Sequence, residues 1–347
     1  MSASASQLRH LERLLAPIAS LLESPDVDEI MINGPWRIYV ERCGRIETTG
    51  LCFESRETLH AAIVGIAQYA GRRVDAYEPV LEVRLPDGSR VEAVLPPAAP
   101  DGPLLNIRRF RSNGEARDLV ARGTIDAAGR DLLKQLVTER NNILVAGGTG
   151  SGKTSLLGAL AGFIPSDQRV VVIEDARELE LPHDHVVHLE ARPADARGRG
   201  EISVRKLFRA TLRLRPDRIV VGEIRGAEAL ELVQAMTSGH GGCLSTLHAT
   251  TAADALRRLE TLCLMSDVEL PLWAVRAQVA SAIDAVVQIE RHADGSRRVS
   301  AITRVENDGE GYRLSQLYPG ESAAAQPWPR GVTRFAHVTA ATEAGQP

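Results

Sequence analysis

The octapeptide from Gly147 to Thr154, with the sequence Gly-Gly-Thr-Gly-Ser-Gly-Lys-Thr, narrows the possible folds of this chain to very few. The apolar run at 142–146 predicts a strand before it, and residues 155–160 predict the first turns of a helix after it. Glycines let successive backbone N–H groups turn inward around phosphate oxygens, and the helix N-terminus adds the positive end of its dipole. A chance glycine-rich turn is the alternative. The strand–loop–helix order favours binding of a nucleoside triphosphate.

The loop also predicts which residues contact the nucleotide. Lys153 is expected to reach the β- and γ-phosphates, and the Thr154 hydroxyl is expected to hold Mg²⁺. ATP and Mg²⁺ are therefore the expected ligands. The predicted binding residues are Gly148, Thr149, Gly150, Ser151, Gly152, Lys153, Thr154 and Ser155.

Length and composition are those of a two-domain enzyme. The chain has 347 residues, too many for one ordinary core, and 44% apolar with 25% charged residues is average globular usage. A net charge of −4 gives no electrostatic reason to expect direct nucleic-acid binding. No apolar run is long enough to span a bilayer, and the N-terminus lacks a signal-peptide pattern. The expected location is the cytosol, unless a partner recruits the chain to a membrane.

Cysteine spacing gives no metal-site signal. Cys43, Cys52, Cys243 and Cys263 are far apart and form no Cys-x-x-Cys pair. We therefore expect a reducing compartment and no structural zinc.

The pattern of the chain changes near residue 115. Residues 1–25 contain an amphipathic helix at 6–23, and 26–112 alternate strand-like and helical segments, which predicts a small α+β domain. A polar linker is expected at 113–120. Residues 121–318 show strand–helix alternation with β-branched runs at 170–173 and 218–221, typical of strands buried on both faces of a parallel sheet. Residues 319–347 are rich in Ala, Pro and Gly and have the composition of a disordered tail.

Three further motifs follow the phosphate loop in order. They span residues 172–179, 214–226 and 237–249, and contain Glu174, Glu223 and His248 respectively. Together with the loop they resemble the Walker A, Asp box, Walker B and His box of the type II/type IV secretion ATPase superfamily. Softer similarity at 71–75, 85–91 and 105–110 is closest to the CpaF-type ATPases of Tad/Flp pilus assembly, and then to conjugative ATPases of the TrbB kind.

The resemblance, which covers about residues 25–310, implies an architecture and a function. It implies an α/β RecA-like P-loop NTPase domain with a smaller α+β N-terminal domain. It also implies a homohexameric ring that hydrolyses ATP to power pilus assembly or protein secretion. The implied partners are polytopic inner-membrane platform proteins, and the implied location is peripheral, at the inner face of the cytoplasmic membrane.

Two glutamates are candidates for the hydrolytic chemistry. Glu174 and Glu223 each follow a buried strand, and the carboxyl ends of such strands meet at the crevice where ligands bind. The alternative for Glu174 is a strand-end carboxylate that caps the next helix. We assign water activation to Glu174 and the metal to Glu223. Which of them is the formal base stays open.

His248 gains its candidate role from the resemblance. A lone histidine is more often a satisfied core or surface residue. The family match assigns it to sensing the γ-phosphate, while His240, between two glycines, also fits a simple loop.

Arginines of the first half of the chain complete the candidate site. Arg90 and Arg108 match family positions that reach across to the triphosphate, where an arginine contributes about 10³–10⁵ in rate. A solvated strand face is the alternative, and it suits Arg84 and Arg109 better. The implied nucleotide site lies between the two domains.

The basic run formed by Arg192, Arg197, Arg199 and Arg205 allows several interpretations. It could be a kinase lid, a DNA contact, a solvated loop or, as we favour from the resemblance, an inter-subunit contact.

Three rival classes remain open for the whole chain. A DNA-transfer motor would share all four motifs, a small-molecule kinase would transfer phosphate to a metabolite, and a nucleotide-gated scaffold would bind without turnover.

Overall fold

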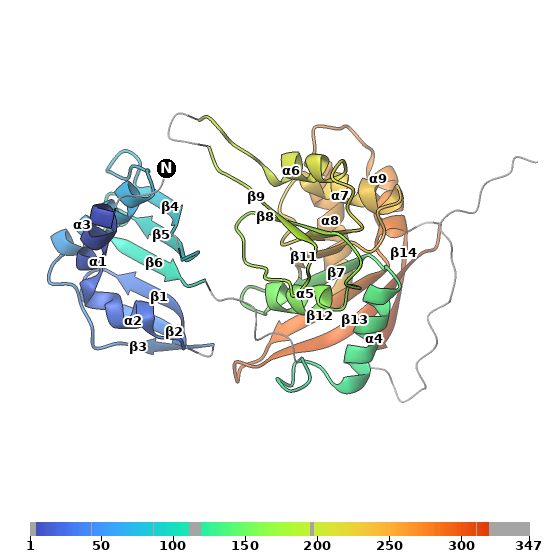
Figure 1. Ribbon diagram of the computed structural model, residues 1–347, viewed down its shortest axis with the longest axis horizontal. Coiled ribbons are helices and arrows are strands. Elements are labelled where there is room, and N and C mark those ends of the chain that lie inside the picture. The colour runs from blue at the N-terminus through green and yellow to red at the C-terminus, as the bar shows by residue number, and fades with distance from the viewer. Residues whose placement is uncertain are drawn as a thin grey trace, which may run out of the picture.

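The computed structural model describes residues 5–42, 44–85, 87–110, 119–194, 198–309 and 311–318. These residues form two lobes (Figure 1), one around a six-stranded sheet and the other around an eight-stranded sheet. Most of the expected linker at 113–120 and all of the expected tail at 319–347 lie outside the described residues. The domain boundaries around them therefore remain predictions.

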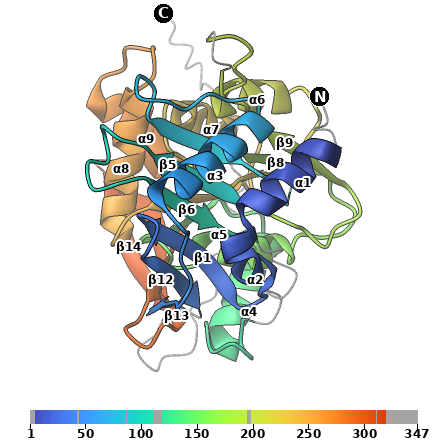
Figure 2. The same ribbon diagram turned by 90° about the vertical axis from the view of Figure 1, so that its left-hand side faces the viewer.

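The first lobe is an antiparallel sheet with the strand order β3-β2-β1-β6-β5-β4. Its helices α1 and α3 cover the face turned away from the second lobe (Figure 2). The elements are α1 (Ala5–Leu14), the 3₁₀ turn η1 (Ala16–Ile18), α2 (Ala19–Glu23), β1 (Val27–Asn33), β2 (Ile38–Arg42), β3 (Arg45–Thr48), α3 (Arg56–Tyr69), β4 (Val80–Arg84), β5 (Arg90–Val94) and β6 (Leu104–Arg108).

The single helix expected at 6–23 is instead two short helices joined by the 3₁₀ turn η1. Pro17 lies inside that turn. Proline lacks the N–H that an α-helix needs and clashes with the carbonyl four residues earlier, so the periodic leucines continue while the helix does not. Leu11, Leu15 and Ile18 are still buried in one core with the six-stranded sheet. The segment is therefore part of the N-terminal core.

The second lobe has the strand order β14-β13-β12-β7-β11-β10-β8-β9. Strands β12 to β9 in that order are parallel, and β13 and β14 extend the sheet as antiparallel neighbours. The elements are α4 (Ala127–Thr138), β7 (Ile143–Gly147), α5 (Lys153–Ala161), β8 (Val170–Glu174), β9 (Val186–Glu190), α6 (Val204–Thr211), β10 (Arg218–Val221), α7 (Glu228–Thr237), β11 (Leu244–His248), α8 (Ala252–Leu264), α9 (Leu272–Ala282), β12 (Ala285–Arg291), β13 (Arg297–Asn307) and β14 (Tyr312–Tyr318).

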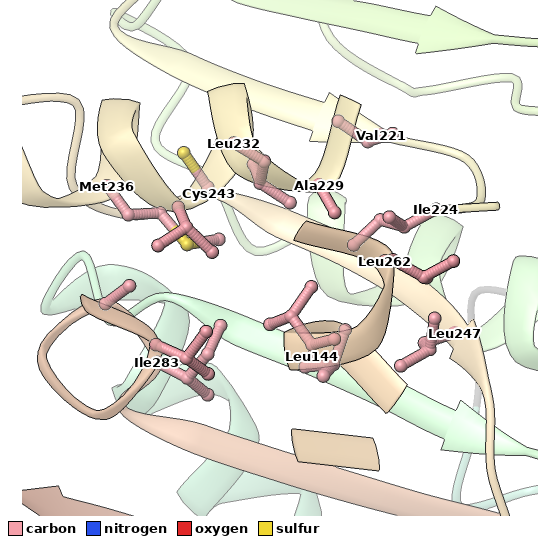
Figure 3. Close-up of a cluster of buried hydrophobic side chains, with 14 of the residues drawn as sticks. Leu144, Val221, Ile224, Ala229, Leu232, Met236, Cys243, Leu247, Leu262 and Ile283 are labelled. Carbon is pink, nitrogen blue, oxygen red and sulfur yellow. The ribbon is translucent and has the colours of Figure 1, made fainter. Parts of the chain in front are cut away.

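The central strands are buried on both faces, as the β-branched runs predict. Leu144, Val221 and Leu247 point to the face covered by α6 to α9 (Figure 3), where Leu232 and Leu262 pack against them. Alternate residues of the same strands form a second core with α4 and α5 on the opposite face. Burial on both faces fixes the register of the parallel strands, and with it the positions of the residues at their carboxyl ends.

None of the helices among the described residues is long and apolar enough to cross a membrane.

Candidate active site at the interface of the two sheets

The carboxyl ends of β7, β8, β10 and β11 meet at one edge of the parallel sheet. The phosphate loop follows β7, Glu174 ends β8, Glu223 lies two residues after β10, and His248 ends β11. A cleft of about 500 Å³ opens there, and residues of both sheets line it, including Arg90 and Arg108 of the first. This is where α/β proteins bind ligands. The fold therefore brings together segments that are far apart in the sequence.

The phosphate loop has the backbone conformation that its glycines predict. Gly150 and Gly152 have φ of 70° and 92°, in the left-handed region that glycine adopts at no steric cost. A Cβ on Gly147 would lie 2.4 Å from the carbonyl oxygen of Ile289. The buried Ser151 hydroxyl donates a 2.9 Å hydrogen bond to the Gly148 carbonyl. The loop thus curls tightly over the N-terminus of α5.

Lys153 points back into the loop. Its ammonium donates to the carbonyl oxygens of Gly147 at 3.1 Å and Gly148 at 2.8 Å, and the side chain is 8% exposed. Burial lowers the pKa of Lys153, and the nearby carboxylate of Glu223 acts in the opposite direction. Two carbonyl oxygens and one carboxylate are weak compensation for a buried cation, so the ammonium is well placed to bind a stronger anion.

His248 joins this lysine to the Walker B glutamate. Its Nδ1 lies 3.2 Å from Lys153 Nζ, and its Nε2 lies 2.7 Å from Glu223 Oε1. An ammonium can only donate, so Nδ1 accepts and the proton is on Nε2. Burial and the charge of Lys153 both lower the pKa of His248, which agrees with a neutral ring. Three predicted residues therefore form one hydrogen-bonded chain.

Glu223 is shared between two partners. One carboxylate oxygen faces His248, and the other accepts from the guanidinium of Arg225, with Arg225 Nε at 2.7 Å. Arg225 also lies 3.6 Å from Asp175. This network holds Glu223 at the mouth of the cleft, with its side chain 17% exposed.

Glu174 occupies the wall of the cleft and is 4% exposed. Its Oε1 accepts from the backbone N–H groups of Glu178 at 2.9 Å and Leu179 at 3.0 Å. Burial raises its pKa to about 7, although the two N–H donors act in the opposite direction. The expected alternative of a helix cap is wrong in its detail, because the segment 175–185 contains no helix. The carboxylate instead fixes the turn that follows β8.

Arg90 and Arg108 lie directly opposite one another on β5 and β6. Arg90 pairs with Glu178 at 2.8 Å across the cleft, and Arg108 is exposed at its margin. Like charges at paired positions of antiparallel strands repel each other, so an anion between them would relieve the repulsion. Both residues line the same cleft as the phosphate loop. The contact with a triphosphate that the resemblance implies for them stays a prediction.

The expectation of a solvated strand face for Arg84 and Arg109 is wrong. Arg84 is paired with Glu190 of β9 and donates to the carbonyl of Arg177, so it bridges the two sheets. Arg109 lines the cleft and donates to the carbonyl of Ser24. Strand periodicity placed both side chains on the sheet surface. It could not show that the second lobe covers Arg84, or that Ser24 of the same lobe lies beside Arg109.

Two arginines of the basic run after β9 bond to other residues of the same chain. Arg192 donates to the Gly200 carbonyl, and Arg205 pairs with Glu231 at 2.7 Å and with Asp267 at 2.5 Å. Arg197 lies outside the described residues. The inter-subunit contact expected here stays a prediction.

Sequence reasoning missed Arg225, Arg291 and Arg297, all of which line the cleft. Arg225 lies within the motif at 214–226, where the sequence assigned a role only to Glu223. Arg291 and Arg297 flank the turn between β12 and β13, more than a hundred residues after the loop. The residue pattern of a hairpin predicts the hairpin itself but does not indicate which distant segment the hairpin contacts.

The donor set suits a nucleotide with a magnesium ion. Mg²⁺ is usually held by one or two carboxylates together with substrate phosphates and water, and the cleft presents the Thr154 hydroxyl and Glu223. No group of three or more His, Cys, Asp or Glu side chains suited to a metal occurs among the described residues. The backbone of the loop, Lys153 and the facing arginines provide the cations and N–H donors that phosphates need.

Comparison with known proteins agrees with this architecture. The model of the family "Type II/IV secretion system protein" matches residues 12–342. A putative conjugal transfer protein of Mycobacterium tuberculosis is 36% identical over 289 residues, covering 81% of this chain and 82% of that protein. The type IV secretion system protein PtlH of Bordetella pertussis is 38% identical over 307 residues, covering 80% and 89%.

Among solved structures, the Yersinia pseudotuberculosis ATPase DotB superposes with a TM-score of 0.58 at 15% identity, covering 88% of this chain and 81% of that one. That likeness concerns the fold and agrees with the predicted α/β ATPase architecture with a smaller N-terminal domain. The family match extends beyond the four motifs in both directions, and the Tad/Flp branch within it stays a prediction. The chain belongs to the type II/IV secretion system protein family.

Proposed function

We propose that this chain is an ATP-hydrolysing motor that powers a secretion or pilus-assembly machine. The observation that carries the proposal is the cleft in which a complete phosphate loop, Glu223 and His248 of one sheet face Arg90 and Arg108 of the other. Phosphoryl transfer to water needs cations at the γ-phosphate, a metal, and a group that orients the water. The cleft offers side chains for each need.

In this proposal Lys153 exchanges its bonds to the Gly147 and Gly148 carbonyls for the β- and γ-phosphates. Its departure removes the donor at His248 Nδ1, so that nitrogen could take up a proton and donate it to a γ-phosphate oxygen while Nε2 stays on Glu223. Thr154 and Glu223 would hold Mg²⁺, which supplies charge neutralisation of the phosphates when bound. Glu174, with a pKa near 7, has the proton affinity of a group that can accept a proton from water.

The arginines of the first sheet connect chemistry with motion. Arg108 can reach a γ-phosphate only while the two sheets stay close, so triphosphate would favour a closed cleft and diphosphate would release it. Such closure is a hinge motion between domains. We infer that a homohexameric ring uses this motion against polytopic membrane partners, at the inner face of the cytoplasmic membrane. The similarity to PtlH, named as a type IV secretion system protein, supports a role in a secretion machine.

A conjugative DNA-transfer motor is the second candidate. The Mycobacterium tuberculosis relative, named as a putative conjugal transfer protein, favours it. The net charge of −4 gives this chain no general attraction to a nucleic acid. Stimulation of turnover by added single- or double-stranded DNA separates the two candidates, because we expect none for a protein-export or pilus motor.

Release of inorganic phosphate from Mg-ATP by the full chain, together with its mass in solution, tests the proposal. We expect phosphate release without any acceptor molecule, loss of release on chelation of Mg²⁺, and the mass of a hexamer. Phosphate that appears only on an added metabolite would indicate a kinase, and nucleotide binding without turnover would indicate a scaffold. A monomer at micromolar concentration with and without nucleotide would contradict a ring motor.

A further inference from the structure

One side chain of the second lobe bonds to the first sheet and lies beside the phosphate loop. Arg291, the last residue of β12, donates from Nη2 to Glu41 Oε1 of β2 at 2.8 Å and to the carbonyl of Gly44. Its Nη1 lies 3.1 Å from the position that a Cβ would take on Gly150. The guanidinium therefore spans the cleft between the N-terminal sheet and the loop.

The same hairpin holds the loop from a second side. Arg297, the cross-strand partner of Arg291, donates from Nε to the Gly150 carbonyl at 3.1 Å. Its Cδ lies 3.0 Å from the position of a Cβ on Gly152. Gly150 and Gly152, the two loop glycines with positive φ, therefore both lie beside the hairpin, and the carbonyl of Gly150 is bonded to it.

We propose that Arg291 is a positioning residue that couples the N-terminal sheet to the phosphate loop, so that its anchor Glu41 controls nucleotide affinity without touching the nucleotide. Arginine suits this role because its planar fork can donate in two directions at once. The pair is largely shielded, with side-chain exposures of 28% for Arg291 and 17% for Glu41. In such surroundings loss of one partner leaves the other charge uncompensated and free to move.

The consequence for the motor concerns how the domains communicate. Arg90 and Arg108 are expected to respond to the γ-phosphate, whereas Arg291 acts on the loop that holds every phosphate. Opening of the cleft would draw Glu41 away, release Arg291 and relax the loop around Gly150. Diphosphate affinity would then fall in the open state, which favours product release. This inference rests on the proposed nucleotide-binding function.

ADP binding to the full chain, measured by isothermal titration calorimetry, tests the coupling. Glu41→Gln should weaken ADP binding about 5-fold or more, the lower end of typical coupling between sites. Arg291→Gln should weaken it at least as much. The double variant should bind no more weakly than Arg291→Gln alone, because both changes remove one link. Glu290→Gln, which alters the neighbouring exposed residue bonded to Ser300, is the matched control and should bind ADP as the wild type does.

Thermal unfolding of each variant shows whether a weaker affinity reflects loss of fold. If a Gln variant does not fold, Glu41→Asp and Arg291→Lys replace it, because these shorter side chains keep their charges but weaken the bond between positions 41 and 291. We expect Arg291→Lys to weaken ADP binding at least as much as Glu41→Asp does. Wild-type ADP affinity in the folded Glu41 variant, with weak binding in the Arg291 variant, would overturn the coupling and make Arg291 a direct ligand. Additive losses would overturn it as well. No ADP binding by the wild type would instead refute the proposed function.

Discussion

His248 Nε2 lies 2.7 Å from Glu223 Oε1, so the ends of β11 and β10 are joined by a side-chain contact. The other ring nitrogen faces Lys153 at 3.2 Å, which extends the contact to the phosphate loop. Three motifs separated by up to 95 positions in the chain thus share one hydrogen-bonded chain. Any ligand that draws Lys153 away also changes the surroundings of His248 and Glu223.

Lys153→Ala should abolish Mg-ATP hydrolysis and leave the fold intact. The polar contacts of the side chain are with loop carbonyls and His248, all at the cleft, and the variant removes only these hydrogen bonds. Phosphate release measured beside circular dichroism checks both parts. Wild-type turnover in this variant would contradict the assignment of the loop to phosphate binding.

Glu223→Gln should bind ATP and turn it over very slowly. Loss of the charge weakens the position expected to hold the metal and also removes the ion pair with Arg225. Single-turnover assays on Glu223→Gln and Glu174→Gln would show loss of which carboxylate slows the chemical step more. Equal wild-type rates in both variants would contradict a catalytic role for either.

The unfolding free energy of the protein should depend on pH because of Glu174. Its folded pKa of about 7 lies above the reference value of 4.5, so the protonated form stabilises the fold below pH 4.5 and that contribution is lost as the pH rises through 7. Gln keeps an oxygen for the two backbone donors and has no charge to bury. Relative to Glu174→Gln, the wild type should therefore lose about 2–3 kcal/mol of unfolding free energy between pH 5 and pH 8. Urea denaturation at both pH values measures the difference, and a difference independent of pH would show that burial does not raise this pKa.

Arg108→Ala tests whether the first sheet takes part in catalysis. If its guanidinium neutralises γ-phosphate charge, kcat should fall about 10²-fold or more, the scale lost when one preorganised donor is removed. ATP affinity should fall less, because Lys153 and the loop amides still hold the phosphates. Arg45→Ala, an exposed arginine on β3 of the same sheet, is the matched control and should keep the wild-type kcat. An unchanged kcat in Arg108→Ala would leave the N-terminal sheet with a docking role alone.

Much of the second lobe could be predicted from the sequence because its signals are local. The β-branched runs at 170–173 and 218–221 are strands β8 and β10, and the glycines of the loop have the φ values that a phosphate cradle needs. The residues at the ends of those strands converge because parallel strands in register must end at one edge. That step from pattern to site requires no knowledge of distant contacts.

The contacts between the lobes could not be predicted in the same way. Arg84 and Arg291 are surface positions by strand periodicity, and each is bound to a partner that only the packing of the two lobes brings near. Arg109 donates to Ser24 of its own lobe, a residue 85 positions earlier in the chain. Pro17 is a local signal for the break between α1 and α2. The leucine periodicity continues on both sides of it and therefore predicted one helix. Pairwise contacts across a domain interface leave no period in the sequence.

A structure of the full chain with Mg²⁺ and a non-hydrolysable ATP analogue would show whether the two sheets bind one nucleotide between them. We expect the triphosphate in the cleft between the two sheets, with Lys153 Nζ moved from the Gly147 and Gly148 carbonyls onto the β- and γ-phosphates. The metal should lie between Thr154 and Glu223, and Arg108 should face the γ-phosphate. A nucleotide bound elsewhere, or bound with Lys153 still on its carbonyls and the arginines of the first sheet turned away, would contradict it.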